Sequence, residues 1–559
     1  MKNWLLGMAL ASSLSAFAQG TVCNADGTVT FQYKNENAHK VAVDVQFAGR
    51  HDMKQNPETK LWTVTLGPAA PDMYPYHFIV DGGDVMDPEC KQYFPNEGFK
   101  NSLLEIPDQK GALAHDILPV KHGNVEYIHY YSKSLGGVNN AVVYTPYGYE
   151  TSNKSYPVFY VISGTTDTED VFFKVGRVNF ILDNLIAKGK AKEMIIVMPY
   201  GNPGKLREQR QKDIKSVTDG FDIFGNDFNN DLMPYIEKHY RTINDADHRA
   251  IAGFSRGGNQ ALMNGLLHLD KFSYLCSYSS FTSMDLPKVY DNAKETNKKI
   301  HLFWMGIGKD DFLYGTSRDY MEFLDKKGIK TIKEFTEGKF GHTWMNCKYF
   351  LSRTLPLLFN PKASAKAMKK CAPAPKATGK EVPFTPSVMA KLFPKPVVSP
   401  EFTKDNIIFR FKAPDATNVY LNSYADNTSE VPVSIMMKKD AEGIWSVSLP
   451  KYFDRKLYYF VVNGDGNKTE GMKVVDPNNM YYLQEGDKEF SVVKPNEMSS
   501  AFDKYAKLVY DFNQNKVTFV PVEGGDWNVD GASKSYSLDD KEAGKAYFLF
   551  LASASPYLK

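Results

Sequence analysis

The sequence predicts an α/β domain flanked by two small all-β sandwiches. Short apolar runs at residues 156–162, 249–252 and 301–307 are typical of buried strands, while segments 259–267 and 345–359 carry apolar residues at helical spacing. On either side of this region the chain repeats one series of alternating apolar and polar runs, separated by Asp-Gly or Asn-Gly turns. Such alternation is typical of small antiparallel sandwiches.

Residues 1–18 are predicted to be a secretory signal peptide. Lys2 precedes an apolar stretch, and Ala16-Phe-Ala18 provides the small-x-small pattern of a cleavage site before Gln19. No other apolar run in the sequence is long enough to span a membrane. We therefore expect an exported protein, periplasmic or extracellular, without a membrane span.

The two sandwiches are expected at residues 20–110 and 401–492. Corresponding strands recur in the same order in both regions, and Trp62 and Trp445 occupy matching places in them. Both tryptophans lie in alternating strands, which favours packing in a core over exposure on a surface. The matching runs are 29–33 and 408–411, 61–66 and 444–449, 76–82 and 459–464, and 86–88 and 475–477.

Two further regions and the cysteines lie outside this pattern. Residues 361–400 are rich in Lys, Ala and Pro, which predicts a linker. Residues 493–559 contain strand-like fragments without a motif, and no role is predicted for them.

Five cysteines fit an oxidising compartment without forming a disulfide scaffold. The candidate pairs are Cys23 with Cys90, and Cys347 with Cys371.

The motif with the most chemical content is Gly253-Phe-Ser255-Arg-Gly257, which follows the apolar run 249–252 and precedes the helical segment 259–267. A strand, a sharp G-x-S-x-G turn and a helix together form a nucleophile elbow, in which the serine hydroxyl stands above the sheet. Glycine is needed at both ends of the turn because a side chain there would collide with neighbouring backbone. Ser255 is therefore the predicted nucleophile.

A serine nucleophile needs a general base, and in this strand-turn-helix arrangement the base is a histidine that follows the serine in the chain. Three histidines follow Ser255. His268 lies on the helix that leaves the elbow, and His301 opens an apolar run, so packing or solvent exposure is expected for both. His342 lies in a glycine-rich loop before the helical segment 345–359. Because catalytic groups collect in such loops, His342 is the predicted base.

The acid that orients the base should come from a strand end between the serine and the histidine. The apolar run 301–307 leads directly into Gly308-Lys-Asp310-Asp311. We predict that Asp311 is the acid, with Asp310 as the alternative.

Ester hydrolysis also needs amide donors for the negatively charged oxygen of the intermediate. The first donor is usually the amide after the nucleophile, here that of Arg256. The second should come from the loop after the strand 156–162, where Gly164 and Thr165 are the candidates.

Residues of about 125–359 resemble the esterase D group of α/β-hydrolases, which includes feruloyl and acetyl-xylan esterases of carbohydrate esterase family 1. The resemblance implies an α/β-hydrolase domain at residues 120–360 and the triad Ser255, Asp311 and His342. The two flanking regions resemble immunoglobulin-like modules of the carbohydrate-binding family 48 type. The matching stretches of the esterase part are 131–135, 143–149, 156–160, 231–241, 248–258 and 341–344.

The resemblance implies a secreted serine esterase that removes feruloyl or acetyl groups from plant polysaccharide such as xylan, without a metal or cofactor. Two alternatives stay open: a ferric-siderophore esterase, and a non-catalytic glycan-binding protein with a decayed hydrolase domain. The chain has 67 basic and 65 acidic residues, a formal net charge of +2, and no basic stripe interleaved with aromatic residues. Nucleic acid is therefore not the expected partner.

Overall fold

The structure is a computed structural model of the chain. The predicted signal peptide, residues 1–18, and the final residues lie outside the part that it describes. The described residues are 20–97, 100–108, 113–202, 221–282, 285–338, 341–381, 384–385, 397–424, 432–451, 457–463, 471–479, 481–485, 488–493, 506–521, 533–540 and 542–553.

A large mixed sheet forms the centre of the molecule. Within the described residues it has eleven strands, in the order β18-β17-β16-β15-β13-β14-β12-β11-β29-β30-β31. The strands from β18 to β14 run parallel, and the others join antiparallel. Their bounds are β11 Asn124–Ser132, β12 Gly137–Thr145, β13 Val158–Ile162, β14 Ile195–Pro199, β15 Arg249–Gly253, β16 Tyr274–Tyr278, β17 Leu302–Gly308, β18 Ile332–Thr336, β29 Lys507–Asp511, β30 Lys516–Val520 and β31 Lys534–Ser537.

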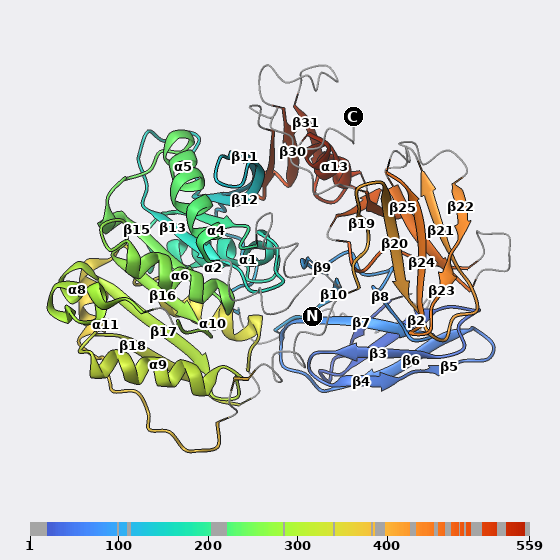
Figure 1. Ribbon diagram of the computed structural model, residues 1–559, viewed down its shortest axis with the longest axis horizontal. Helices are drawn as coiled ribbons and strands as arrows, with labels where there is room; N and C mark the ends of the chain where they lie inside the picture. The colour runs from blue at the N-terminus through green and yellow to red at the C-terminus, as the bar shows by residue number, and fades with distance from the viewer. Residues whose placement is uncertain are drawn as a thin grey trace, which may run out of the picture.

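Helices cover both faces of the parallel part of this sheet (Figure 1). Successive residues of β13 point alternately into two hydrophobic clusters, which is why its sequence is apolar throughout. One cluster includes side chains of α2 and α10, and the other includes side chains of α6 and α9. The helices are α1 Val171–Lys174, α2 Val178–Ala187, α4 Phe221–Asp227, α5 Met233–His239, α6 Arg256–Leu267, α7 Pro287–Tyr290, α8 Ala293–Lys299, α9 Tyr314–Lys326, α10 Trp344–Thr354, α11 Pro361–Met368 and α13 Ala543–Ser553.

The C-terminal region, for which the sequence suggested no role, extends the central sheet. Strand β29 pairs with β11, and β30 and β31 follow it outward (Figure 1). Leu508 and Phe519 enter the same hydrophobic cluster as Phe550 of α13. The Phe550 ring stacks on His129 of β11 with 3.9 Å between the ring centroids. The described part of the C-terminal region is therefore built into the large mixed sheet.

The two repeated regions have the same arrangement of strands. In each, the described residues form a four-stranded and a six-stranded antiparallel sheet, connected in the same order. The first contains β1 Val22–Cys23, β2 Val29–Lys34, β3 Val41–Val45, β4 Gly49–Asp52, β5 Lys54–Gln55, β6 Leu61–Leu66, β7 Asp72–Val80, β8 Gly83–Val85, β9 Tyr93–Phe94 and β10 Asn101–Ile106. The second contains β19 Glu401–Phe402, β20 Asn406–Lys412, β21 Val419–Tyr424, β22 Val433–Met436, β23 Lys438–Lys439, β24 Ile444–Pro450, β25 Leu457–Val462, β26 Met472–Val474, β27 Tyr482–Glu485 and β28 Lys488–Val492.

The two sandwiches pack against each other and share one hydrophobic cluster. Trp62 and Trp445 are both buried in it, and their indole N–H groups donate to the carbonyls of Asn35 and Ala413. The expectation that these tryptophans pack in a core is confirmed. In Figure 1 the sandwiches, coloured blue and orange, lie together on the side of the molecule opposite the helices α8 and α9.

The segment predicted as a linker begins with a helix, α11, which starts at its first residue. Pro361 occupies the first turn, where its missing N–H costs nothing, and the Asn360 side chain accepts from the Ala363 amide at 3.3 Å. The preceding helix α10 ends at Thr354, earlier than the predicted end at residue 359. Pro356 explains this end, because proline has no N–H to donate to the carbonyl four residues earlier in the helix.

All five cysteines are free thiols, so the two predicted pairs are not formed. The thiol of Cys23 donates to the Glu105 carbonyl, and that of Cys90 donates to the Gln92 carbonyl at 3.2 Å. Burial raises the pKa of both thiols, which disfavours the thiolate that disulfide formation needs.

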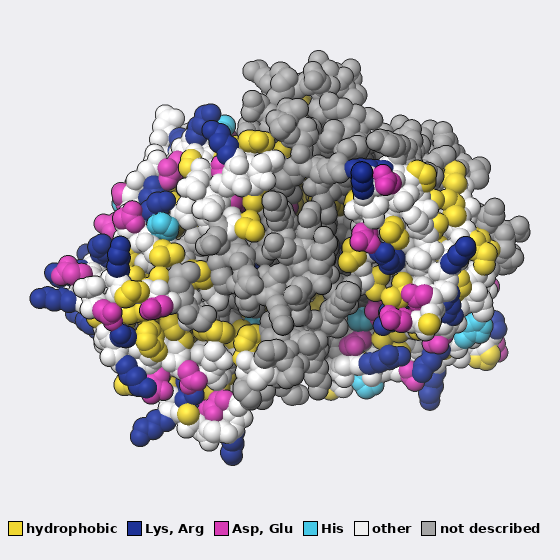
Figure 2. All heavy atoms as spheres, in the orientation of Figure 1, with side chains coloured by type: hydrophobic (Ala, Val, Ile, Leu, Met, Phe, Trp, Pro, Cys, Tyr) yellow, Lys and Arg dark blue, Asp and Glu magenta, His cyan; other side chains and the backbone are white. Residues whose placement is uncertain are grey.

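The surface carries charges of both signs over the α/β domain and the sandwiches (Figure 2). Among the residues that the structure describes, no helix is both long enough and apolar enough to cross a bilayer.

Asp476, in the second sandwich, provides a prediction about stability. Burial raises the pKa of its carboxyl from 3.8 to about 7, and the Tyr458 hydroxyl donates to it at 2.8 Å. The folded state therefore holds the proton more tightly than the unfolded state, so the carboxyl's contribution to stability is present below pH 4 and lost as the pH rises to 7.

We expect the Asp476→Asn variant to become more stable relative to the wild type as the pH rises from 4 to 8. Thermal unfolding across that range measures the difference. Asp405→Asn, at an exposed position of the same sandwich, is the control and should leave the pH dependence unchanged. An unchanged pH dependence in Asp476→Asn would contradict the assignment.

Candidate active site

Ser255 lies in a sharp turn between β15 and α6. Its backbone angles are φ 57° and ψ −124°, a conformation that costs on the order of 1–3 kcal/mol for a residue with a side chain. Its amide donates to the Tyr278 carbonyl at 2.9 Å, which ties the turn to the neighbouring strand β16. The turn therefore has the backbone strain of the predicted elbow.

The glycines of the motif are explained by close backbone contacts. A Cβ on Gly253 would lie 2.2 Å from the backbone of Gly257, and a Cβ on Gly257 would lie 2.1 Å from the Ile162 carbonyl oxygen. Gly258 is equally constrained, because its Cβ would lie 2.6 Å from that of Ser280. The helix α6 can begin directly behind Ser255 only because these positions have no side chain.

Asp311 and His342 form a buried hydrogen-bonded pair. The two carboxylate oxygens lie 2.9 and 3.0 Å from Nδ1 of the imidazole, and the Asp311 side chain has no exposed surface. The Leu313 amide also donates to this carboxylate at 2.8 Å, which fixes its orientation. Asp310 is exposed, so the structure brings the first of the two candidate acids, and not the second, to the histidine.

The imidazole of His342 lies between two phenylalanine rings, with ring centroids 4.8 Å from Phe254 and 4.5 Å from Phe312. Phe254 immediately precedes Ser255, so the histidine stands beside the elbow. The loop that carries His342 is fixed by Asn346 of α10. The Asn346 side chain donates to the Gly341 carbonyl and accepts from the Thr336 hydroxyl. With Nδ1 facing a carboxylate, the pair favours the tautomer in which Nε2 can accept a proton.

The other two histidines after Ser255, His268 and His301, lie away from the elbow. His301 bonds to Asp247 at 2.8 Å, and His268 lies at the end of α6, partly exposed. Neither is brought to the elbow, which agrees with the expectation from the sequence.

The predicted amide donors belong to the start of α6 and to the loop after β13. Arg256 is the first residue of α6, where helix geometry provides no intrahelical acceptor for an amide and the helix dipole favours negative charge. Its side chain extends away from its own amide to donate to the Gly201 carbonyl at 3.0 Å.

The loop after β13, residues 163–167, holds the other predicted donors and is called the oxyanion loop below after this predicted role. In this loop the Gly164 amide donates to Asp167 at 3.1 Å. This bond differs from the expected role of Gly164 as an oxyanion donor, because its N–H is directed to a carboxylate. Thr165, the other predicted loop donor, stays a prediction.

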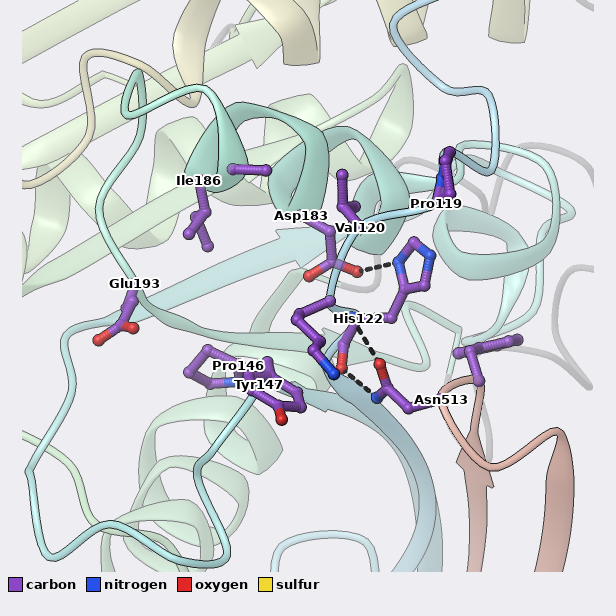
Figure 3. Close-up of a pocket in the computed structure, with 12 residues that line it drawn as sticks. Pro119, Val120, His122, Pro146, Tyr147, Asp183, Ile186, Glu193 and Asn513 are labelled. Atoms are coloured by element: carbon purple, nitrogen blue, oxygen red, sulfur yellow. Dashed lines mark hydrogen bonds and ion pairs between the residues drawn. The ribbon is translucent and has the colours of Figure 1, made fainter.

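Figure 3 shows a second buried His–Asp pair, His122 with Asp183. By strand register it lies at the end of the sheet opposite the elbow. It borders a cavity of about 750 Å³ near Tyr147, where β12 ends beside the amino end of β14. Both ring nitrogens of His122 face acceptors, at 3.0 Å from Asp183 and 2.9 Å from the Leu118 carbonyl. The hydrogen bond with Asp183 raises the pKa of His122, so the ring is suited to a structural ion pair and not to a general base.

Sequence reasoning missed the residues that surround the oxyanion loop. Asn96 and Glu97 come from the N-terminal sandwich, and Tyr200 and Asn202 follow β14; all four bond to the loop or to one another beside it. No motif marks these residues, because their contact depends on two segments far apart in the sequence.

Comparison with known proteins matches part of the chain to an esterase family. Residues 132–326 match the family model described as putative esterase. An endo-1,4-beta-xylanase/feruloyl esterase of Xylanibacter ruminicola is 29% identical over 345 residues, which is 59% of this chain and 45% of that protein. The chain thus spans less than half the length of this relative.

Solved esterase structures also match. A ferulic acid esterase of Anaeromyces mucronatus, in complex with ferulic acid, is 25% identical with a TM-score of 0.39, covering 44% of this chain and 93% of that one. An enterobactin esterase of Shigella flexneri is 15% identical with a TM-score of 0.44, covering 60% of this chain and 94% of that one.

Proposed function

From the esterase domain at residues 132–326, we propose that the protein is a serine carboxylic-ester hydrolase that removes feruloyl groups from plant polysaccharide such as xylan. The observation that carries the proposal is the buried Asp311–His342 pair beside the strained elbow at Ser255. Backbone strain costs stability, so a hydrolase domain that had lost its activity would not be expected to retain the strained serine, the glycines and the oriented histidine together.

In the proposed mechanism, Ser255 Oγ attacks the ester carbonyl carbon while His342 Nε2 takes the hydroxyl proton. The amides of Arg256 and Thr165 donate to the carbonyl oxygen as it becomes negatively charged. The C–O bond to the sugar then breaks, and His342 gives its proton to the departing sugar oxygen.

The acyl-enzyme is then hydrolysed by the same groups in reverse roles. His342 removes a proton from water as the water oxygen attacks the acyl carbon, and the free acid leaves as Ser255 recovers its proton. Asp311 remains ionised throughout, holds the imidazole in orientation and stabilises the imidazolium.

The acyl group and the sugar chain are supported less directly than the ester chemistry. The Xylanibacter ruminicola relative is described as acting on xylan and as a feruloyl esterase, which supports feruloylated xylan as the substrate. The proposal also includes export by the signal peptide at residues 1–18, and two immunoglobulin-like sandwiches related to carbohydrate-binding family 48 modules.

The acyl class can be tested by incubating the purified protein with methyl ferulate, feruloylated arabinoxylan fragments and acetylated xylan, and measuring released acid. We expect ferulate from the first two substrates. Acetate alone would reassign the enzyme to deacetylation. Hydrolysis of a catecholate siderophore ester without release of ferulate or acetate would favour the siderophore alternative, and binding to xylan without any hydrolysis would favour a glycan-binding protein.

A further inference from the structure

The N-terminal sandwich reaches the oxyanion loop through the segment between β9 and β10. Asn96 forms an antiparallel bridge with Asp167, and the Glu97 amide donates to the Thr166 carbonyl at 2.7 Å. The Asn96 side chain also donates to the Thr166 hydroxyl at 2.7 Å. Two residues of the sandwich therefore lie alongside the loop as a short strand would.

Glu97 additionally places a buried carboxylate behind the loop. The residue is 2% exposed, and its Oε1 accepts from the Tyr200 hydroxyl at 2.9 Å and from the Asn202 side-chain nitrogen at 2.6 Å. The same Asn202 nitrogen donates to the Thr165 carbonyl at 2.6 Å. Both protons of the Asn202 amide are thus used, one on the carboxylate and one on the loop.

The carboxylate determines which end of the Asn202 amide faces the loop. A side-chain amide has a donor end and an acceptor end of nearly equal size, and only its neighbours decide the orientation. An acceptor at Glu97 requires the donor end to point inward, and the same NH₂ group can then bind the Thr165 carbonyl. Without Glu97, only the Thr165 carbonyl would hold the donor end of the amide, and the Asn202 side chain would lose one of the two acceptors that fix its position.

This bond matters because of its place in the loop. The peptide group that carries the Thr165 amide lies between two others that are held by hydrogen bonds: the Gly164 amide by Asp167, and the Thr165 carbonyl by Asn202. The direction of the Thr165 N–H therefore depends on both neighbours. Oxyanion stabilisation is sensitive to such direction, because the donor must already point to where the charge develops.

We propose that Glu97 is a positioning residue of the active site, which acts through Asn202 to hold the Thr165 amide in place for the oxyanion. The inference rests on the proposed esterase function and extends it: the N-terminal sandwich supplies part of the support of the catalytic site. A sandwich that only bound polysaccharide would affect polymeric substrates and leave small soluble esters unaffected.

Steady-state kinetics with methyl ferulate tests the proposal. We expect Glu97→Ala to lower kcat by about 10- to 100-fold, less than the loss of an oxyanion donor itself, and to leave KM within about twofold. Glu97→Gln should stay within about threefold of wild-type kcat, because its amide oxygen can accept the same two bonds. A kcat for Glu97→Ala within twofold of the wild type, or a loss confined to KM, would overturn the proposal.

Glu105 offers a matched control in the same sandwich. Its carboxylate also binds the hydrolase domain, through Arg177 at 2.8 and 2.6 Å, and neither residue contacts the oxyanion loop in the described bonds. Glu105→Ala should leave kcat unchanged. An equal loss of kcat in both alanine variants would mean that loosening the contact between the domains, and not the loop, lowers the activity.

Asn202→Ala tests the same bond from the other side and serves if Glu97→Ala does not fold. It should lower kcat to a similar degree, and the double variant should be no slower than the slower single variant, because both changes act through one bond. Additive losses in the double variant would contradict the proposed route through Asn202.

Labelling of the serine by diisopropyl fluorophosphate separates this inference from the proposed function. The reaction joins Ser255 Oγ to phosphorus and releases fluoride, and intact mass follows its rate. Slower labelling of Glu97→Ala than of the wild type would support the inference whatever the natural ester is. Equal labelling rates would refute the inference alone, whereas a wild-type chain that is not labelled would refute the serine esterase itself and the inference with it.

Discussion

Replacing Ser255 with alanine is expected to lower ester hydrolysis by at least about 10⁴-fold, because loss of the nucleophile in serine hydrolases removes most of the rate enhancement. Alanine should also relieve little of the strain, since the turn retains φ near 57° for any residue at this position. The fold should therefore persist. Release of ferulate from methyl ferulate, and acetate release from an acetylated substrate, measure the effect.

The informative control for Ser255→Ala is another buried serine at the end of a neighbouring strand. Ser279 follows β16 and also has a positive φ, 51°, but it lies outside the G-x-S-x-G turn. Ser279→Ala should leave kcat within about an order of magnitude of the wild type, as expected for a residue outside the reacting groups. Full activity of Ser255→Ala on a simple aryl ester would refute the proposed mechanism.

The Asp311→Asn variant is expected to lower kcat by about 10³- to 10⁴-fold while leaving the overall geometry intact. The side-chain amide introduced by this substitution has the size of the carboxyl but can present an N–H to Nδ1 of His342. The imidazole would then carry its proton on Nε2, the wrong nitrogen for accepting the proton of Ser255. The reaction rate should fall by the same factor at every substrate concentration, with KM unchanged, because the change affects proton transfer and not binding.

Asp310→Asn is the matched control, since the two aspartates are adjacent and differ only in burial. Asp310 is exposed, whereas the Asp311 side chain is fully buried against His342. Asp310→Asn should therefore retain nearly all activity. If both variants lost activity equally, the Asp311–His342 pair would be a structural contact and the acid would have to be sought elsewhere.

The candidate site could be predicted from the sequence where its geometry is local. The elbow depends on glycines within a few residues of Ser255. Their spacing in the sequence indicates where the backbone segments of the turn approach too closely for a side chain. His342 can be predicted because a glycine-rich loop precedes a helical pattern. Of the two adjacent aspartates the sequence favoured Asp311 and left Asp310 as the alternative, and the packing of the β17 strand end directs the Asp311 carboxylate to His342.

Other features depend on contacts between distant segments. The strands β29–β31 are short and carry no motif, so nothing in their composition indicates that they extend the hydrolase sheet. Glu97 is likewise an ordinary glutamate in the sequence, and its role arises only when the sandwich segment lies against residues 163–167 and 200–202.

The sequence by itself thus determined the elbow, the candidate base, the repeated sandwiches and the burial of Trp62 and Trp445, because periodicity and glycine spacing record local backbone and packing demands. Tertiary structure decided between Asp311 and its alternative Asp310, left the five thiols unpaired and placed the sandwich segment at Glu97 against residues 163–167. These features depend on which side chains meet after folding, and a hydrogen bond between residues far apart in the chain leaves no periodic trace in the sequence.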